Sequence, residues 1–252
     1  MLVLCSGMQR SGSTLQYELV KKILISCEKS FIEYGYAESG DEENILNFLG
    51  RKTADFYLVK THDFLDINEV NKVVIYSWRD IRDVAASIKN KFGKKDKILL
   101  TTLDQCVGEH YKIIKIADVV QVYSYLINDK TRCLLELAES LGVNSNDLNV
   151  DNIIESSEKD KDRIKDSSAI GSLKTYLLKW TNAPMAKVLA SKLHLSKSVK
   201  AIIRGRLIQG GVGAFHYGHI TKNEGKSGTY SKYLSNSEMS YINTHYRSLY
   251  ED

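Results

Sequence analysis

The sequence lacks a large excess of charge of either sign. Its 252 residues carry 35 lysines and arginines against 31 acidic residues, which leaves a net charge of +4. A protein that coats nucleic acid through its overall charge needs a much larger positive excess, so the composition argues against that function. Proline is also scarce, since Pro184 is the only one, and this argues against a proline-rich linker or tail.

Paired cysteines and long apolar runs are missing as well. The four cysteines lie far apart and form no C-x-x-C pair, so they predict neither a zinc site nor a redox motif. Residues 1–5 run directly into glycine and polar residues, without the basic and apolar regions of a signal peptide. No apolar stretch approaches the ~20 residues that span a bilayer. We therefore expect a soluble cytoplasmic protein with free thiols and no membrane partner.

Apolar runs alternate with helical patterns along the chain. Buried parallel strands are predicted at residues 1–4, 56–59, 73–76 and 119–123. Helices are predicted from Leu15 to Cys27, up to Ser87 after the third strand, over 98–117, between Asn128 or Asp129 and Gly142, and from Ser235, which has a capping-box partner in Glu238. This alternation predicts an α/β fold, a doubly wound parallel sheet of about four to five strands flanked by helices, as a single domain over 1–252.

A glycine-rich loop follows the first predicted strand. Residues 7–14 (GMQRSGST) have the Walker A spacing, with Ser13 where lysine is usual. Such a loop points its amides inward, and the following helix presents its positive N-terminus to an anion. Ser11, Ser13 and Thr14 add hydroxyl donors, and Arg10 adds a charged donor. The missing lysine argues against a magnesium-dependent triphosphatase and predicts a different phosphate ligand.

Two further polar segments lie at predicted strand ends. Lys60 and His62 follow the second strand, and Arg79 follows the third, with Ser87 two turns into the next helix. In a doubly wound sheet the carboxyl ends of the strands carry the binding site. These four side chains are therefore expected to face the same crevice as the glycine loop.

Together these segments resemble the sulfotransferases that use 3′-phosphoadenosine 5′-phosphosulfate (PAPS). In that family a P-K/R-S-G-T/S-T loop binds the 5′-phosphosulfate, and residues 9–14 (QRSGST), including Gly12, match it. The family motif R-x-P-R-D-V-x-x-S binds the 3′-phosphate, and its first arginine and last serine fall on Arg79 and Ser87. Ile81 replaces the proline of that motif. A K-T-H segment carries the family's catalytic histidine, which falls on His62.

Two weaker similarities assign further residues. Residues 122–126 (VYSYL) resemble a Y-E-D-L strand end whose tyrosine, here Tyr123, reaches the adenine side of the cofactor. Residues 225–230 (GKSGTY) resemble the segment R-K-G-x-x-G-x-W, which closes over the 3′-phosphate. Lys226 and Gly228 thereby become candidate cofactor-binding residues.

The resemblance implies transfer of a sulfuryl group from PAPS to a hydroxyl or amine of a small molecule, with 3′-phosphoadenosine 5′-phosphate (PAP) as product and no metal. His62 is then the general base, while Lys60 and Arg10 stabilise the transferring and leaving groups. By family analogy the acceptor is a metabolite or natural product. Residues 167–215 are the candidate acceptor-side lid, and Glu33 and Glu38 are the alternative bases.

Other functions stay open on the sequence alone. A P-loop small-molecule kinase shares the fold and the loop, but it needs magnesium and usually a lysine where Ser13 stands. A non-catalytic nucleotide-binding module needs the loop but has no use for His62. The lysines between Lys89 and Lys97 are only a weak argument for nucleic acid, because such runs usually lie in solvent. The oligomeric state is left open.

Overall fold

The computed structural model describes residues 1–51, 53–93, 96–160, 211–212, 215–216 and 227–251. The chain divides into two compact units, Met1–Ile154 with Thr221–Asp252, and Glu155–Ile220. In the second unit, the described part includes an antiparallel pair of short strands, β6 (Gly211–Val212) and β7 (Phe215–His216). The rest of the predicted lid at 167–215 lies outside the described residues, and so does Lys226.

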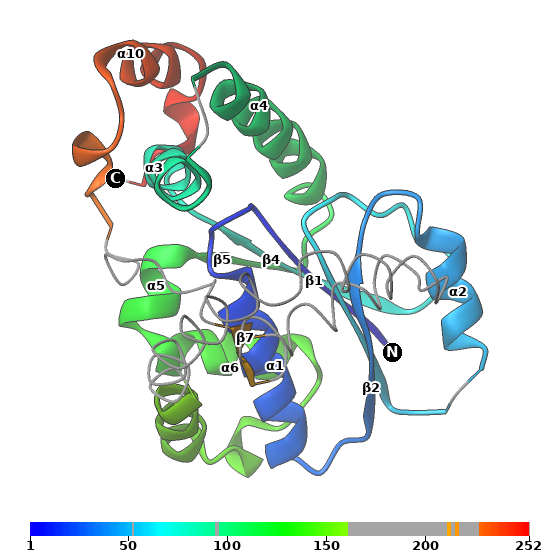
Figure 1. The fold of residues 1–252 in the computed structure, drawn as a ribbon. Coiled ribbons are helices and arrows are strands. Elements are labelled where there is room, and N and C mark those ends of the chain that lie inside the picture. Colours follow the sequence, from blue (N-terminus) through cyan, green and yellow to red (C-terminus); the bar gives the residue numbers. More distant parts are fainter. Residues whose placement is uncertain (52, 94–95, 161–210, 213–214, 217–226, 252) are drawn as a thin grey trace, which may run out of the picture. The chain divides into compact units, whose positions relative to one another are not determined.

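A sheet of five parallel strands, in the order β2-β3-β1-β4-β5, forms the centre of the first unit (Figure 1). Its strands are β1 (Leu2–Gly7), β2 (Phe31–Ala37), β3 (Phe56–Thr61), β4 (Lys72–Trp78) and β5 (Val119–Val122). Because β1 pairs with β3 on one side and β4 on the other, the glycine loop after β1 emerges at the middle of the carboxyl edge. The predicted α/β class and strand number are confirmed.

Two expectations about the strands are wrong. The sequence patterns do not predict β2, because Glu33 and Gly35 interrupt its apolar run and most of its residues are only partly buried. An edge strand needs no continuous apolar sequence, since one edge of it has no partner strand. The fourth strand was expected to include Tyr123, but β5 ends at Val122 and Tyr123 begins a helix. Tyrosine and valine are both common in strands, so propensity does not mark this boundary.

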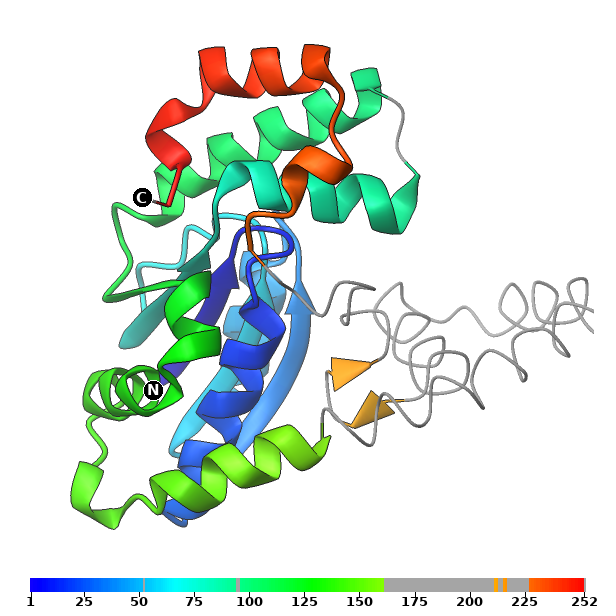
Figure 2. The same cartoon turned by 90° about the vertical axis from the view of Figure 1, so that its left-hand side faces the viewer.

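Helices cover both faces of the sheet (Figures 1 and 2). The α-helices of the first unit are α1 (Ser13–Ser26), α2 (Glu42–Leu49), α3 (Ile81–Phe92), α4 (Asp96–Ile113), α5 (Tyr123–Asn128), α6 (Lys130–Ser140) and α10 (Asn236–His245). On one face Leu2 and Leu4 of β1 pack with Ile45 of α2 and Ile113 of α4. Alternate residues of a strand point to opposite faces, so the fully buried Val3 points to the other side, where α1 contacts β1 and β4.

The predicted helix ends agree with the structure at α6 and α10. The Asp129 carboxylate accepts a hydrogen bond from the Arg132 backbone N–H at the start of α6, and Gly142 follows the helix with φ of 65°. At α10 the side chains of Ser235 and Glu238 form the predicted reciprocal capping box. The helix α10 ends at His245, and a single 3-10 turn, Arg247–Leu249, follows it.

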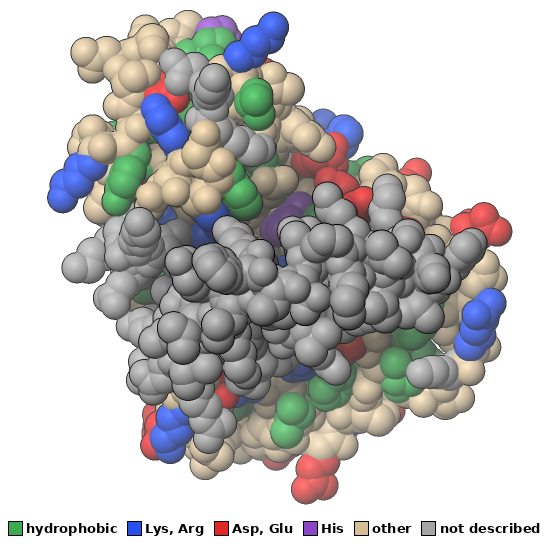
Figure 3. Space-filling model, in the orientation of Figure 1, with side chains coloured by type: hydrophobic (Ala, Val, Ile, Leu, Met, Phe, Trp, Pro, Cys, Tyr) green, Lys and Arg blue, Asp and Glu red, His purple; other side chains and the backbone are tan. Residues whose placement is uncertain are grey.

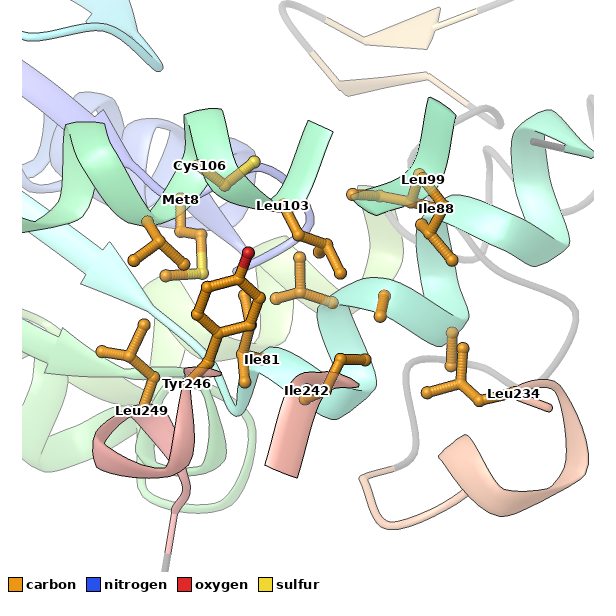
Figure 4. Packing of buried hydrophobic residues seen from close by; sticks show 14 residues of the cluster. Met8, Ile81, Ile88, Leu99, Leu103, Cys106, Leu234, Ile242, Tyr246 and Leu249 are labelled. Carbon is orange, nitrogen blue, oxygen red and sulfur yellow. The ribbon is translucent and has the colours of Figure 1, made fainter. Parts of the chain in front are cut away.

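A hydrophobic cluster joins α3, α4 and the C-terminal segment (Figure 4). Ile81 of α3, Leu103 of α4 and Ile242 of α10 are fully buried in it. Met8 from the glycine loop also belongs to the cluster and is 3% exposed. Burial of a side chain of this size stabilises the fold by about 1.5–3 kcal/mol, so Met8 fastens the loop to the helical layer. Across the described ranges, no helix combines the length and apolar character that a bilayer crossing requires.

Candidate active site

The glycine loop is held in place by hydrogen bonds to β4. The backbone N–H of Met8 donates to the Ser77 carbonyl over 2.9 Å. The Ser11 hydroxyl lies 2.6 Å from the Met8 carbonyl, 2.9 Å from the Ser77 carbonyl and 2.9 Å from the Ser77 hydroxyl. Ser11 is fully buried, so its hydroxyl supports the shape of the loop. Its role as a direct cofactor ligand stays a prediction.

Two loop positions require glycine. Gly12 has φ of 85°, in the left-handed region, and a Cβ there would lie 3.0 Å from the ring of Tyr123. A Cβ at Gly7 would lie 2.4 Å from the Ser77 hydroxyl oxygen and 2.5 Å from Cβ of Ser13. The loop therefore packs against β4 on one side and against Tyr123 on the other. Tyr123, predicted at a strand end, reaches the same place from the first position of α5.

Arg10 joins the loop to α3. It is one of the non-glycine residues with positive φ, at 67°, a conformation that costs free energy and recurs at functional sites. Its Nε donates to the hydroxyl of Ser87 over 2.9 Å. Burial lowers the pKa of the Arg10 guanidinium, and the nearby charge of Arg79 lowers it further. The structure thus brings together Arg10 and Ser87, which the sequence assigned to opposite ends of one cofactor.

Lys60 occupies the next-to-last position of β3 and is 7% exposed. Its Nζ donates to the hydroxyl of Thr14, at the start of α1. Burial lowers the pKa of Lys60 to about 8, with a smaller lowering from the charge of Arg10. The lysine ammonium thus lies beside the glycine loop in a position that the sequence predicted from the strand end.

His62 follows the end of β3, and its Nδ1 lies 2.6 Å from the carbonyl oxygen of Gly7. A carbonyl only accepts hydrogen bonds, so in neutral His62 the proton is on Nδ1 and Nε2 carries the lone pair. Burial lowers the pKa of His62 to about 4, and the charge of Lys60 contributes to the lowering. At neutral pH the side chain is therefore an uncharged imidazole whose Nε2 can accept a proton.

Arg79 follows β4 directly and is 4% exposed. Its guanidinium carbon lies 4.0 Å from the centroid of the Tyr123 ring, and its Nη2 lies 3.5 Å from Oδ2 of Asp83. The same carboxylate oxygen accepts the backbone N–H of Gly228 over 2.9 Å. A small pocket is lined by Arg79, Asp83, Ala86, Ser87, Asn90, Thr229 and Tyr233. The sequence did not assign Asp83 to this site, although its place one helical turn after Arg79 was a usable signal.

A second, small pocket opens beside His62. Tyr76, Glu109 and His110 are among its lining residues, and the sequence assigned none of them to the site. The alternative bases lie elsewhere on the sheet edge. Glu33, within β2, accepts the hydroxyl of Tyr17 over 2.8 Å and pairs with Lys21 at 3.0 Å, while Glu38 is exposed just beyond β2. No group of three or more potential metal ligands occurs in the part of the chain that the structure describes.

Several solved structures share this fold. Mouse sulfotransferase SULT7A1, complexed with PAP, matches 98% of this chain and 84% of its own, at 14% identity and a TM-score of 0.57. Retinol dehydratase with retinol and PAP covers 100% of this chain and 81% of its own, at 18% identity and a TM-score of 0.53. The same enzyme with androsterone and PAP gives 16% identity, the same coverage and a TM-score of 0.54. No protein-family model and no curated protein matches the sequence. The chain therefore has the P-loop-like α/β fold of these sulfotransferase structures.

Proposed function

We propose that this protein is a cytoplasmic sulfotransferase that moves a sulfuryl group from PAPS to a hydroxyl or amine of a small molecule, a metabolite or natural product. The observation that carries the proposal is the meeting of three buried or largely buried cations, Arg10, Lys60 and Arg79, around the glycine loop, beside a neutral His62. Asp83 pairs with Arg79, but the charge of Arg79 still lowers the pKa of Arg10, and the charge of Arg10 lowers that of Lys60, so the arrangement favours a polyanionic ligand. PAP in all three matched structures supports the choice of ligand.

The donor set fits PAPS in charge and in hydrogen-bonding type. The loop amides, with the hydroxyls of Ser13 and Thr14, are suited to the 5′-phosphosulfate. The pocket with Arg79 and Ser87 suits the 3′-phosphate. The backbone N–H of Gly228 donates to the carboxylate of Asp83, which lines the same pocket. We assign the ring of Tyr123 to the adenine side and keep Lys226 as a further 3′-phosphate ligand. When bound, PAPS supplies a sulfuryl group that is activated by attachment to phosphate.

In this proposal His62, Arg10 and Lys60 each have a separate role in sulfuryl transfer. Nε2 of His62 takes the proton of the acceptor as the acceptor oxygen or nitrogen forms its bond to sulfur, an effect typically worth about 10²–10⁴ in rate. The bond from sulfur to the bridging oxygen breaks, and its electron pair stays on the 5′-phosphate of PAP. Arg10 and the loop amides stabilise that charge, while Lys60 holds the sulfuryl oxygens. Cationic side chains thus provide the stabilisation in this scheme, which needs no metal.

The test is incubation of the protein with PAPS and a metabolite extract, followed by mass spectrometry for products that gain a sulfuryl group. We expect products in EDTA. Turnover of ATP that depends on magnesium indicates the kinase instead, and PAP binding without any sulfuryl product indicates a non-catalytic module.

A variant pair tests the base. His62→Ala should abolish most turnover and leave PAP affinity nearly intact, because the proposed role of Nε2 is to take the proton of the acceptor and not to bind the cofactor phosphates. His245→Ala, at an exposed position at the end of α10, is the matched control and should keep full turnover. Full turnover in His62→Ala contradicts the assignment, and Glu38→Gln and Glu33→Gln then test the alternative bases.

A further inference from the structure

The two carboxylate oxygens of Asp83 differ in their hydrogen bonds. Oδ2 lies 3.5 Å from Nη2 of Arg79 and accepts the backbone N–H of Gly228 over 2.9 Å. Oδ1 is buried, and among the described residues it has no hydrogen-bond partner. The residue is 3% exposed and lines the small pocket that also contains Arg79 and Ser87. Because a buried charged acceptor without a donor is destabilising, Oδ1 indicates that a ligand brings an O–H or N–H group to this place.

The other side chains of this pocket suit the opposite kind of group. Arg79 supplies N–H donors, and the hydroxyl of Ser87, which accepts Nε of Arg10, has its own O–H to donate. Such donors bind phosphate oxygens. Oδ1 of Asp83 can only accept a hydrogen bond, and its charge repels a phosphate. The pocket therefore fits a ligand that carries a phosphate and a hydrogen-bond donor side by side, and a phosphate alone meets only half of that requirement.

We propose that Oδ1 of Asp83 accepts a hydrogen bond from the 2′-hydroxyl of the donor ribose. This assignment rests on the proposed function, because it takes the pocket with Arg79 and Ser87 as the 3′-phosphate site. In PAPS the 2′-hydroxyl is on the carbon next to the one that bears the 3′-phosphate. Since Asp83 and Arg79 are themselves in contact, a phosphate on the arginine brings the neighbouring hydroxyl to the carboxylate. Acidic side chains also bind the ribose 2′-hydroxyl in dinucleotide-binding α/β sheets.

Asp83 then selects the position of the phosphate on the ribose. A hydroxyl is among the smallest groups that can donate to Oδ1, which suits a small pocket. A phosphate on the 2′-oxygen is larger, has no proton to donate in its dianionic form, and brings negative charge against a buried carboxylate. The residue therefore favours a 3′-phosphate with a free 2′-hydroxyl over both the 2′-deoxy nucleotide and the 2′-phosphate isomer.

The test uses three nucleotides that differ only at the ribose: PAP, 2′-deoxyadenosine 3′,5′-bisphosphate and adenosine 2′,5′-bisphosphate. Isothermal titration calorimetry measures the affinity of each. We expect PAP to bind about tenfold or more tightly than the 2′-deoxy analogue, which lacks the hydroxyl, and the 2′,5′-isomer to bind most weakly. All three carry two phosphates, and side chains of both charge signs are scattered over the face drawn in Figure 3, so surface charge gives little preference among them.

The variant Asp83→Asn assigns the preference to this residue. Arg79 and the N–H of Gly228 both donate to the Oδ2 position, so the amide oxygen of the asparagine is expected there and its NH₂ group takes the place of Oδ1. The advantage of PAP over the 2′-deoxy analogue should fall to about threefold or less, because the charged acceptor is lost. Affinity for the 2′,5′-isomer should rise, because an N–H donor now faces its 2′-phosphate. Glu139→Gln, which removes an exposed carboxylate on α6, is the control and should leave all three affinities unchanged.

The outcomes separate this inference from the proposed function. If PAP binds and the 2′-deoxy analogue or the 2′,5′-isomer binds equally well, the role of Asp83 is overturned and Oδ1 is left to an ordered water, while the donor site stands. A full preference for PAP that persists in Asp83→Asn also overturns it. If none of the three nucleotides binds, the donor assignment fails and the inference fails with it. The comparison in the unaltered protein decides the point even where the variant does not fold.

Discussion

The charge state of His62 can be tested by removing Lys60, the cation that lowers the pKa of His62 most. Its pKa is lowered from 6.5 to about 4, mainly by burial and next by the charge of Lys60. A depression of that size disfavours the imidazolium by about 3 kcal/mol. Lys60→Met removes the ammonium and keeps a chain of similar length. Because burial remains, we expect the pKa of His62 in this variant to rise but to stay below 6.5.

The measurement is a ¹⁵N NMR titration of the histidine ring nitrogens from pH 7.5 down to pH 4.5, with His62→Ala to assign the resonances. In the unaltered protein we expect His62 to stay neutral through pH 5.5, with its proton on Nδ1. Thr14→Val removes the hydroxyl that Lys60 contacts but keeps the charge, so it serves as the matched control and should leave the titration unchanged.

Activity should follow the same titration. A protonated imidazole cannot accept a proton, so kcat/KM should fall as the pH drops toward about 4 and should stay level from there up to about 8, where Lys60 loses its proton. A midpoint for His62 near 6.5, or a proton on Nε2, would refute the reasoning. If the pKa of His62 does not rise in Lys60→Met, then the charge of Lys60 does not affect the protonation of the imidazole.

Three further predictions concern the loop, the cofactor and acid stability. Gly12→Ala should lower the free energy of unfolding in urea by about 1–3 kcal/mol, because of the φ of 85° and the Tyr123 ring 3.0 Å from the new Cβ; Gly108→Ala, whose Cβ meets nothing within 4 Å, should not. Ser87→Ala should weaken PAP binding about two- to tenfold by calorimetry, since it removes the hydroxyl that contacts Arg10; unchanged affinity contradicts its role. Burial lowers the pKa of His110 to about 4, so from pH 6.5 down to 4 the unfolded chain binds a proton that the folded chain does not. Urea midpoints should therefore fall between pH 7 and pH 5, less so in His110→Phe, and an equal fall in both proteins rules out His110 as the source.

Sequence patterns predict the positions of candidate site residues that lie at or just after the ends of strands. Lys60, His62 and Arg79 come at or just after buried apolar runs, and parallel strands bring such positions to one edge. Ile81 shows that the turn after β4 does not depend on the proline of the resembling motif. Asp80 adopts φ of −43° and ψ of 122°, the extended conformation usual before proline, and its carboxylate accepts the N–H of Arg82. Burial of Ile81 in the helical cluster holds the turn in place.

Sequence patterns could not predict the pocket beside His62. Tyr76 and His110 are separated by 34 residues and meet only because α4 packs on the face of the sheet to which Tyr76 points. In the sequence, Tyr76 is one residue of an apolar strand and His110 one residue of a helix, and neither position carries a local signal. The same holds for β2, an edge strand whose pattern is too mixed to recognise.

The pocket lined by Arg79 and Ser87 combines residues that are far apart in the sequence, since Thr229 and Tyr233 also line it. Gly228 bonds to Asp83 across 145 residues, and Glu251 bonds to Asp80 across 171 residues. On a ribosome, the sheet, the glycine loop and its cations can assemble long before these partners have been translated. A chain stopped before residue 227 therefore has the cations but lacks Thr229 and Tyr233 of that pocket. Under the proposed function, such a chain should not bind PAPS, and the capacity to bind the donor arises only once the C-terminal segment has been made.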